Sequence, residues 1–151
     1  VLFGDIAKAA AALAIGGVLA GMMGKLVAGI FVILGHVFPV YFGFRGGKGV
    51  LVGATMLVFL DWRIFLVALV LFVIAVALTR WVSLGSILGA ISFPITMQVF
   101  YGDARLSVVA ALMAAAVVFM HRSNIKRILS GTENRFSFHS KPQIHDDADQ
   151  K

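Results

Sequence analysis

Residues 64–79 read IFLVALVLFVIAVALT, an apolar run without a charged side chain. It is bounded by Asp61-Trp62-Arg63 on one side and by Arg80-Trp81 on the other. A helix of this length crosses most of the hydrocarbon core of a bilayer. Tryptophan at both ends is typical of the membrane–water interface. This stretch therefore predicts a membrane helix.

The whole chain has the same character. Of its 151 residues, 60% are hydrophobic and 13% are charged, and the mean hydropathy is +0.98. A soluble domain carries about 45–50% apolar and about 25% charged residues. The composition excludes an ordinary water-soluble globule, and it excludes disorder, which needs low hydrophobicity. The absence of cysteine excludes disulfides, thiolate metal sites and a cysteine nucleophile.

The pattern recurs along the chain on both sides of residues 64–79. Some of these runs are shorter than the about 18–20 residues that a full crossing prefers, but short helices can end at a cavity inside a bundle. We therefore expect an all-α, polytopic membrane helical bundle with about six transmembrane or half-membrane helices in this chain. The other predicted spans are 9–24, 26–44, 49–60, 84–102 and 106–120.

Basic residues are unevenly distributed among the predicted loops. If alternate loops face the cytoplasm, ten of the 13 lysine and arginine residues lie on that side. This is the positive-inside bias, and it predicts that both ends of the chain are cytoplasmic. The net charge of +6 is therefore attributed to loops at the membrane and not to a nucleic-acid partner. We expect a membrane domain over residues 1–136 and a polar, disordered tail over 137–151.

A glycine-rich basic cluster precedes the short span 49–60. It reads Phe44-Arg45-Gly46-Gly47-Lys48-Gly49. Glycine lets the backbone present its N–H groups to an anion at the start of a helix, and Lys48 and Arg45 add positive charge. Phosphate is the ligand that these groups favour, although the Walker A pattern is absent and ATP is not implied. The alternative is a flexible basic loop.

Two further clusters carry polar side chains that are candidates for contact with a substrate. Ser83 and Ser86 lie at the start of span 84–102, where capping of the helix by Ser83 is the favoured interpretation and contact of the Ser86 hydroxyl with a ligand is the alternative. His121 and Asn124 share a face if the helix continues past Met120. A neutral imidazole can accept a proton from an alcohol. The alternative for the second cluster is a solvated basic end to the last span.

The order and separation of these motifs are those of a known family. Together they resemble the bacterial membrane glycerol-3-phosphate acyltransferase that uses acyl phosphate as donor. In that family another helix and a cytoplasmic loop come first, so the resemblance implies that this chain lacks both and that a complete protein has seven helices. One departure is Leu51-Val52, where the family tends to have Ala-Thr. The matching stretches are Gly35-His36-x-Phe38-Pro39, residues 44–50, residues 83–86 and residues 121–134.

The resemblance implies an enzyme of phospholipid synthesis. It would transfer a fatty acyl group from acyl phosphate to the 1-hydroxyl of glycerol 3-phosphate, giving lysophosphatidic acid and phosphate. The implied partners are these two reactants and membrane lipids, with no cofactor, metal or nucleic acid. The implied location is the bacterial cytoplasmic (inner) membrane, with the active face on the cytoplasmic side. The rival functions are a small-anion channel or transporter and a non-catalytic membrane subunit.

The physical reading and the resemblance assign roles to the same residues. Lys48, with Arg45, Gly46, Gly47 and Gly49, is predicted to hold a substrate phosphate.

His121, Asn124 and Ser86 are predicted to position glycerol 3-phosphate. His121 is either the general base or only orients the alcohol while a donor phosphate oxygen takes the proton. His36 is either a further substrate-binding residue or a satisfied core histidine. Glu133 is a further candidate at the substrate site, where it would orient Arg127 or Arg135, or else it is an exposed tail charge.

Overall fold

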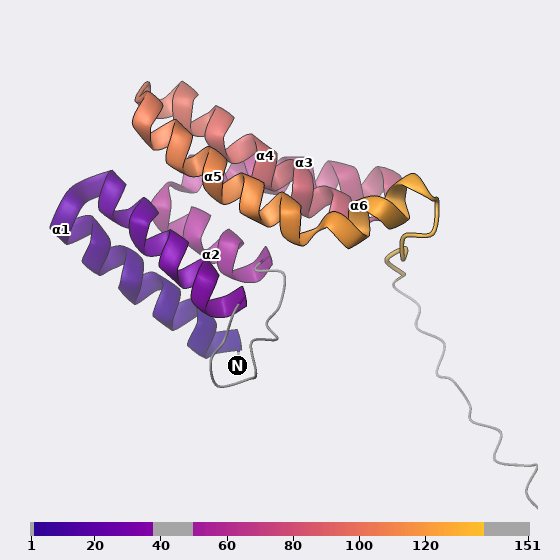
Figure 1. Cartoon of the computed structure of the whole chain (residues 1–151), viewed down its shortest axis with the longest axis horizontal. Helices are drawn as coiled ribbons and strands as arrows, with labels where there is room; N and C mark the ends of the chain where they lie inside the picture. Colours follow the sequence, from indigo (N-terminus) through magenta and orange to yellow (C-terminus); the bar gives the residue numbers. More distant parts are fainter. Residues whose placement is uncertain (1, 38–49, 138–151) are drawn as a thin grey trace, which may run out of the picture.

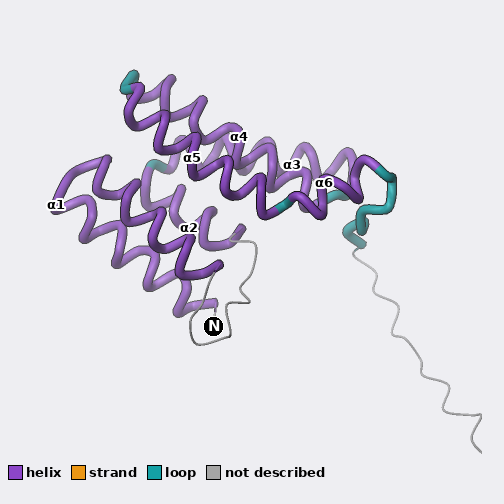
Figure 2. Tube along the Cα trace, in the orientation of Figure 1, coloured by secondary structure: helices purple, strands orange, loops and turns teal. Residues whose placement is uncertain are grey.

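The computed structural model describes residues 2–37 and 50–137, and this part of the chain contains helices and no strands (Figures 1 and 2). The predicted all-α fold is confirmed. Residues 38–49 and 138–151 lie outside the described residues, and with them most of the expected tail over 137–151. The helices are α1 (Leu2–Val37), α2 (Val50–Leu60), α3 (Trp62–Thr79), α4 (Val82–Tyr101), α5 (Ala104–Met120) and α6 (Arg122–Leu129).

Helix α1 is a helical hairpin and not one straight rod (Figure 1). Its helical dihedral angles are interrupted at Ala20 (φ −148°) and Gly21 (φ 58°). The positive φ favours glycine, which has no Cβ to clash in that conformation. The sequence predicts the boundary between the first two spans at Lys25, whereas the structure has it at this turn. The chain reverses at Gly21 because glycine adopts a positive φ without a steric clash, and the position of the Lys25 charge does not decide where the turn forms.

Two glycines allow the arms of the hairpin to approach closely. A Cβ on Gly16 would overlap the carbonyl oxygen of Gly24, and a Cβ on Gly24 would overlap that of Gly16. The α3–α4 contact uses the same device, because a Cβ on Gly85 would come within 2.7 Å of the Phe72 ring. Small residues of this kind let helix backbones pack tightly in a membrane, where van der Waals contact drives association.

The surface of the bundle is apolar where lipid would cover it. Leu78 is 81% exposed and Val99 is 72% exposed, although both are aliphatic. Three helices are long and apolar enough to cross a membrane, and α5 with α6, bent by 59°, forms a fourth candidate span. The chain is therefore a multi-pass membrane protein. Because α1 is a hairpin, its two arms together with α2, α3, α4 and α5 correspond to the expected set of about six transmembrane or half-membrane helices, of which α2 is a short apolar helix.

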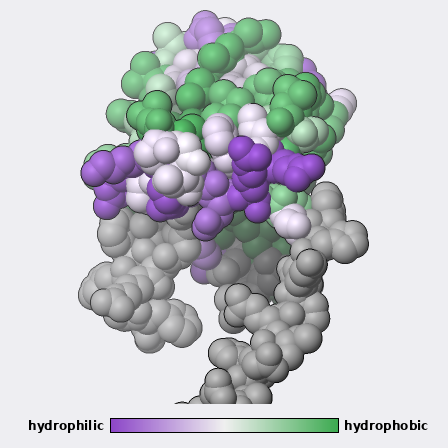
Figure 3. Space-filling view, turned by 90° about the vertical axis from the view of Figure 1, so that its right-hand side faces the viewer, coloured by the Kyte–Doolittle hydropathy of each residue, from purple (hydrophilic) through white to green (hydrophobic). Residues whose placement is uncertain are grey.

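The loops alternate between the two ends of the bundle (Figure 1). The start of α1, the start of α2, the α3–α4 junction and α6 lie at one end, and the turns at 20–21, 61 and 102–103 lie at the other. Figure 3 views the first end and shows a band of hydrophilic residues across it, with hydrophobic surface above. This alternation agrees with the topology expected from the charges. The cytoplasmic identity of the first end stays a prediction.

At the opposite end, Asp61 ties the α2–α3 junction to the end of α4. Its carboxylate accepts hydrogen bonds from the Arg63 backbone N–H at 2.9 Å, from Arg63 Nη2 at 2.7 Å and from the Tyr101 hydroxyl at 2.7 Å. The Arg63 side chain holds the pKa of Asp61 well below its usual range, against the opposing effect of burial and with help from Tyr101. These hydrogen bonds hold the start of α3 against the end of α4.

The glycine contact in α1 gives a first prediction. Gly24→Ala inserts a methyl group against the Gly16 carbonyl and forces the two arms apart, so we expect a loss of about 1–3 kcal/mol in the free energy of unfolding. Thermal unfolding of the detergent-solubilised protein measures this. The control is Gly4→Ala, because a Cβ on Gly4 meets nothing within 4 Å. Equal midpoints for the two variants would refute the tight hairpin.

Candidate active site

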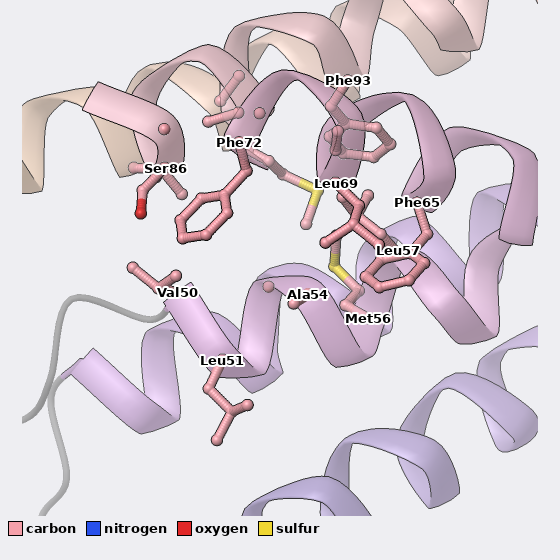
Figure 4. A pocket seen from close by; sticks show the side chains of 18 of the residues that line it. Val50, Leu51, Ala54, Met56, Leu57, Phe65, Leu69, Phe72, Ser86 and Phe93 are labelled. Carbon is pink, nitrogen blue, oxygen red and sulfur yellow. The ribbon is translucent and has the colours of Figure 1, made fainter. Parts of the chain in front are cut away.

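Two pockets of different character meet in the part of the bundle that the structure describes. An apolar pocket of about 400 Å³ lies among α2, α3, α4 and α5, with Leu57, Leu69 and Phe93 among its lining residues (Figure 4). A polar pocket of about 320 Å³ lies at the α6 end of the bundle. Val50 and Ser86 line both pockets. The two cavities therefore adjoin at the first turns of α2 and α4.

The polar pocket collects side chains that are far apart in the sequence. They come from the first turn of α4, from the bend between α5 and α6, and from the segment that follows α6. Hydroxyl, imidazole, carboxamide, carboxylate and guanidinium groups are all present. The polar lining residues are Ser83, Ser86, His121, Asn124, Glu133, Asn134 and Arg135.

His121 sits at the bend between α5 and α6 and is 1% exposed. Its Nδ1 lies 2.8 Å from the carbonyl oxygen of Val117. Because a carbonyl oxygen only accepts, Nδ1 must carry the hydrogen in this contact. In the neutral ring Nε2 is then the unprotonated nitrogen, which can accept a hydrogen bond or a proton. The helix does not run on straight past Met120, but His121 and Asn124 both line the polar pocket.

Glu133 is the centre of a buried hydrogen-bond network. Its Oε1 accepts from Ser83 Oγ at 2.6 Å and from Asn124 Nδ2 at 2.6 Å, and its Oε2 accepts from Arg127 Nε at 2.8 Å. The carboxylate thus joins α4, α6 and the segment after α6. Of the two arginines considered from the sequence, the structure pairs Glu133 with Arg127.

These contacts set the charge of Glu133. Burial by itself raises the pKa of Glu133. The hydrogen bonds from Ser83, Asn124 and Arg127 together lower this pKa by more than burial raises it, so that it falls to about 2. The carboxylate is therefore ionised at neutral pH. The interpretation of Ser83 as a helix cap is wrong, because Trp81 is the N-cap residue of α4 and the Ser83 hydroxyl is used by Glu133.

A tight turn brings the chain back onto the pocket after α6. Gly131 has φ of 70°, and the N–H of Thr132 donates to the Arg127 carbonyl at 2.8 Å while the N–H of Gly131 donates to the Ile128 carbonyl at 3.1 Å. This is the Schellman arrangement that ends helices at glycine. Residues 132–136, called the C-terminal strap below, then run to the α3–α4 junction, where the Phe136 N–H donates to the Arg80 carbonyl at 2.7 Å.

The predicted site residues fall into three groups. Ser86, His121, Asn124 and Glu133 converge on the polar pocket. His36 is half-buried in the last turn of α1 and is not among the described residues that line either pocket. The glycine-rich cluster lies outside the described residues, although Val50, which follows it directly, lines both pockets. That cluster comprises Arg45, Gly46, Gly47, Lys48 and Gly49.

Sequence reasoning missed the other strap residues. Asn134 and Arg135 line the polar pocket and were not singled out as site residues. The signal that could have found them is Gly131, because glycine directly after a basic amphipathic helix predicts a chain reversal.

Comparison with known proteins identifies the fold. A family model described as glycerol-3-phosphate acyltransferase matches residues 1–131. A glycerol-3-phosphate acyltransferase of Thermoanaerobacter sp. (strain X514) is 38% identical over 131 residues, which are 87% of this chain and 66% of the relative. That of Chlorobaculum parvum is 40% identical over 136 residues, covering 76% of this chain and 59% of the relative. The chain thus spans somewhat less than two thirds of these relatives.

Two solved structures have the same architecture. They are crystal structures of PlsY (YgiH), an integral membrane glycerol 3-phosphate acyltransferase, in its lysophosphatidic acid form and its glycerol 3-phosphate form. The first superposes with a TM-score of 0.82 at 30% identity, over 90% of this chain and 70% of PlsY. The second gives a TM-score of 0.81 at 30% identity, over 90% and 69%.

The Glu133 network predicts a specific pH dependence of stability. The pKa of Glu133 falls from its ordinary 4.5 to about 2 on folding, so its contribution is complete above pH 4.5 and is lost as the pH falls through about 2. Thermal unfolding in detergent between these two values should therefore lose stability more steeply in the wild type than in Glu133→Gln. Parallel pH profiles would contradict the network. Near pH 7 the variant should be less stable by about 1–3 kcal/mol.

Proposed function

The chain belongs to the glycerol-3-phosphate acyltransferase family, and we propose that it moves a fatty acyl group from acyl phosphate to the 1-hydroxyl of glycerol 3-phosphate. The products are lysophosphatidic acid and inorganic phosphate. The observation that carries this proposal is the junction of the polar and the apolar pocket at Val50 and Ser86. An acyl phosphate has a charged head joined to a hydrocarbon chain, and the joined pockets have the same division.

The apolar pocket is proposed to hold the acyl chain. Phe65, Phe72 and Phe93 line it together with aliphatic side chains, and Ser86 stands at one end (Figure 4). Burying hydrocarbon is worth about 0.8 kcal/mol per CH₂. The bound acyl chain would therefore supply binding energy, and Ser86 marks the end of the pocket at which the reacting carbonyl would lie.

The polar pocket is proposed to position the alcohol. The Ser86 hydroxyl donates to the Val82 carbonyl at 3.0 Å, so its lone pairs remain to accept a hydrogen bond. His121 Nε2 is also an acceptor. Asn124 is held in place by Glu133, which in this proposal has a positioning role at the substrate site. The 1-hydroxyl of glycerol 3-phosphate donates to His121 and is thereby aimed at the acyl carbon.

The glycine-rich cluster is proposed to bind phosphate. Lys48, Arg45 and the backbone of Gly46, Gly47 and Gly49 precede Val50, where α2 begins. A helix N-terminus favours an anion, and the pocket junction lies at this terminus. This arrangement would place a phosphate beside the acyl carbonyl.

The proposed reaction is a direct acyl transfer. The hydroxyl oxygen of glycerol 3-phosphate bonds to the acyl carbon, the bond from that carbon to the phosphate oxygen breaks, and inorganic phosphate leaves. The hydroxyl proton passes to His121 Nε2 or to a phosphate oxygen of the donor. Because acyl phosphate is already activated, positioning and stabilisation of the developing charge are sufficient, and no acyl-enzyme is required.

The location follows the charge distribution. We propose that the end of the bundle that carries α6 and the polar pocket faces the bacterial cytoplasm, because ten of the 13 basic residues belong to loops and termini assigned to that side. Both reactants would then reach the site from the cytoplasm and the inner membrane.

The proposal is tested with the protein at its natural full length, purified in detergent. Palmitoyl phosphate and glycerol 3-phosphate should yield lysophosphatidic acid and inorganic phosphate in equal amounts. No product with either reactant in excess would contradict acyl transfer. Phosphate flux into sealed vesicles without an acyl donor would instead favour the rival transporter.

His121 gives a kinetic prediction. His121→Gln removes the imidazole acceptor while keeping a polar side chain, and we expect kcat to fall about 10²–10⁴-fold. Assays of the wild type and the variant across pH separate the two roles of His121. A large residual rate with unchanged pH dependence would remove the role as base and leave only orientation of the alcohol.

The apolar pocket gives a second kinetic prediction. Gly53 lines this pocket, and a Cβ placed on it meets nothing within 4 Å. Gly53→Leu should therefore fill part of the pocket and raise the KM for long-chain acyl phosphate more than for short-chain donors. Val58→Leu is the control, because Val58 is exposed on the same helix and does not line the pocket. Equal effects on all donors would argue against the acyl site.

A further inference from the structure

We propose that Arg135, carried by the C-terminal strap into the lining of the polar pocket, binds the phosphate group of a reactant and so contributes to substrate selection. This inference rests on the acyl transfer proposed above and adds a residue to it. The shared chemistry is a phosphate dianion, which both glycerol 3-phosphate and acyl phosphate carry.

The first support is the way in which Arg135 is held. Two residues before it, Glu133 is fixed by Ser83, Asn124 and Arg127. One residue after it, the Phe136 N–H is bound to the Arg80 carbonyl at 2.7 Å. The backbone at Arg135 is thus anchored on both sides, although the side chain itself is exposed. An anchored backbone with an exposed cation is suited to binding a ligand that arrives from solvent.

The second support is the charge balance of the pocket. Of the described residues that line the pocket, Arg135 and Glu133 carry formal charge. The Glu133 carboxylate is paired with Arg127, which does not line the pocket. Within the described part of the chain, the structure shows no carboxylate paired with Arg135. Among the residues that the structure describes, the pocket therefore presents one cation whose charge is not offset locally, and an anion is the ligand that it favours.

The third support is the neighbourhood of Arg135. The same pocket holds Ser86, Asn124 and the imidazole of His121, which are proposed to position the hydroxyl to be acylated. A guanidinium is planar and carries several N–H donors, so it can form two parallel hydrogen bonds to one phosphate group. Arg135 can therefore hold the phosphate of a reactant whose other end lies at His121 or at the acyl pocket.

The test compares Arg135→Gln and Arg135→Lys with the wild type at natural full length. Each reactant is varied while the other is saturating. We expect Arg135→Gln to raise the KM for at least one reactant 10-fold or more, and Arg135→Lys, which keeps the charge but loses the fork, to raise it less. An increase confined to glycerol 3-phosphate assigns Arg135 to the acceptor, and an increase confined to acyl phosphate assigns it to the donor.

The control variant is Lys126→Gln, which removes a positive charge from α6 at an exposed position that does not line the pocket. If Arg135→Gln leaves both KM values at the level of this control while acyl transfer persists, the role of Arg135 is refuted and the proposed function stands. Absence of acyl transfer in the wild type would refute the function instead.

Binding of phosphate at Arg135 is also measured directly, by thermal unfolding with and without inorganic phosphate. Inorganic phosphate should raise the thermal unfolding midpoint of the wild type and of Lys126→Gln, because it binds the folded state. Arg135→Gln should show a much smaller rise. The same midpoints without phosphate show whether the variant is folded. Equal stabilisation of all three proteins by phosphate would overturn the inference.

Discussion

The polar end of the bundle depends on one buried carboxylate. Glu133 accepts hydrogen bonds from a serine 50 residues earlier in the chain, from the carboxamide of Asn124 and from the guanidinium of Arg127. A buried charge is costly unless it is paired and fully hydrogen-bonded. The network satisfies that requirement, and in doing so it fixes α4, α6 and the C-terminal strap relative to one another. His121, Asn124 and Arg135 line one pocket because these three segments are joined.

The second constraint comes from the membrane. Spanning helices must satisfy their own backbone, so an irregular chain or a helix end is tolerated at depth only beside protein or a cavity. The short helix α2 and the 59° bend between α5 and α6 are such features, and both border the pockets. An apolar cavity inside the bundle thereby meets a polar cavity at its end. A substrate with a charged head and a hydrocarbon tail fits that division.

Local patterns in the sequence predicted the helical membrane fold, and they singled out four of the residues that line the polar pocket. The apolar runs indicated helices, and the spacing of His121 and Asn124 indicated a shared helix face, which in the structure borders the polar pocket. Two features of the structure depend on interactions that a local sequence pattern does not reveal. The hairpin turn depends on the positive φ of Gly21, which a charge at Lys25 does not reveal. The role of Ser83 depends on its contact with Glu133 across 50 residues, so a local capping interpretation failed. The place of Arg135 in the lining of the polar pocket was missed for a similar reason, since it depends on the chain reversal at Gly131.

The junction of the two pockets is tested most directly by a structure of the full-length protein with glycerol 3-phosphate and a non-hydrolysable acyl phosphonate. We expect the hydrocarbon chain between α2 and α4, the acyl carbon beside Ser86, and the 1-hydroxyl of glycerol 3-phosphate within hydrogen-bond distance of His121 Nε2. A chain bound on the outer surface of the bundle, or a glycerol 3-phosphate bound away from His121 and Asn124, would contradict the proposed function.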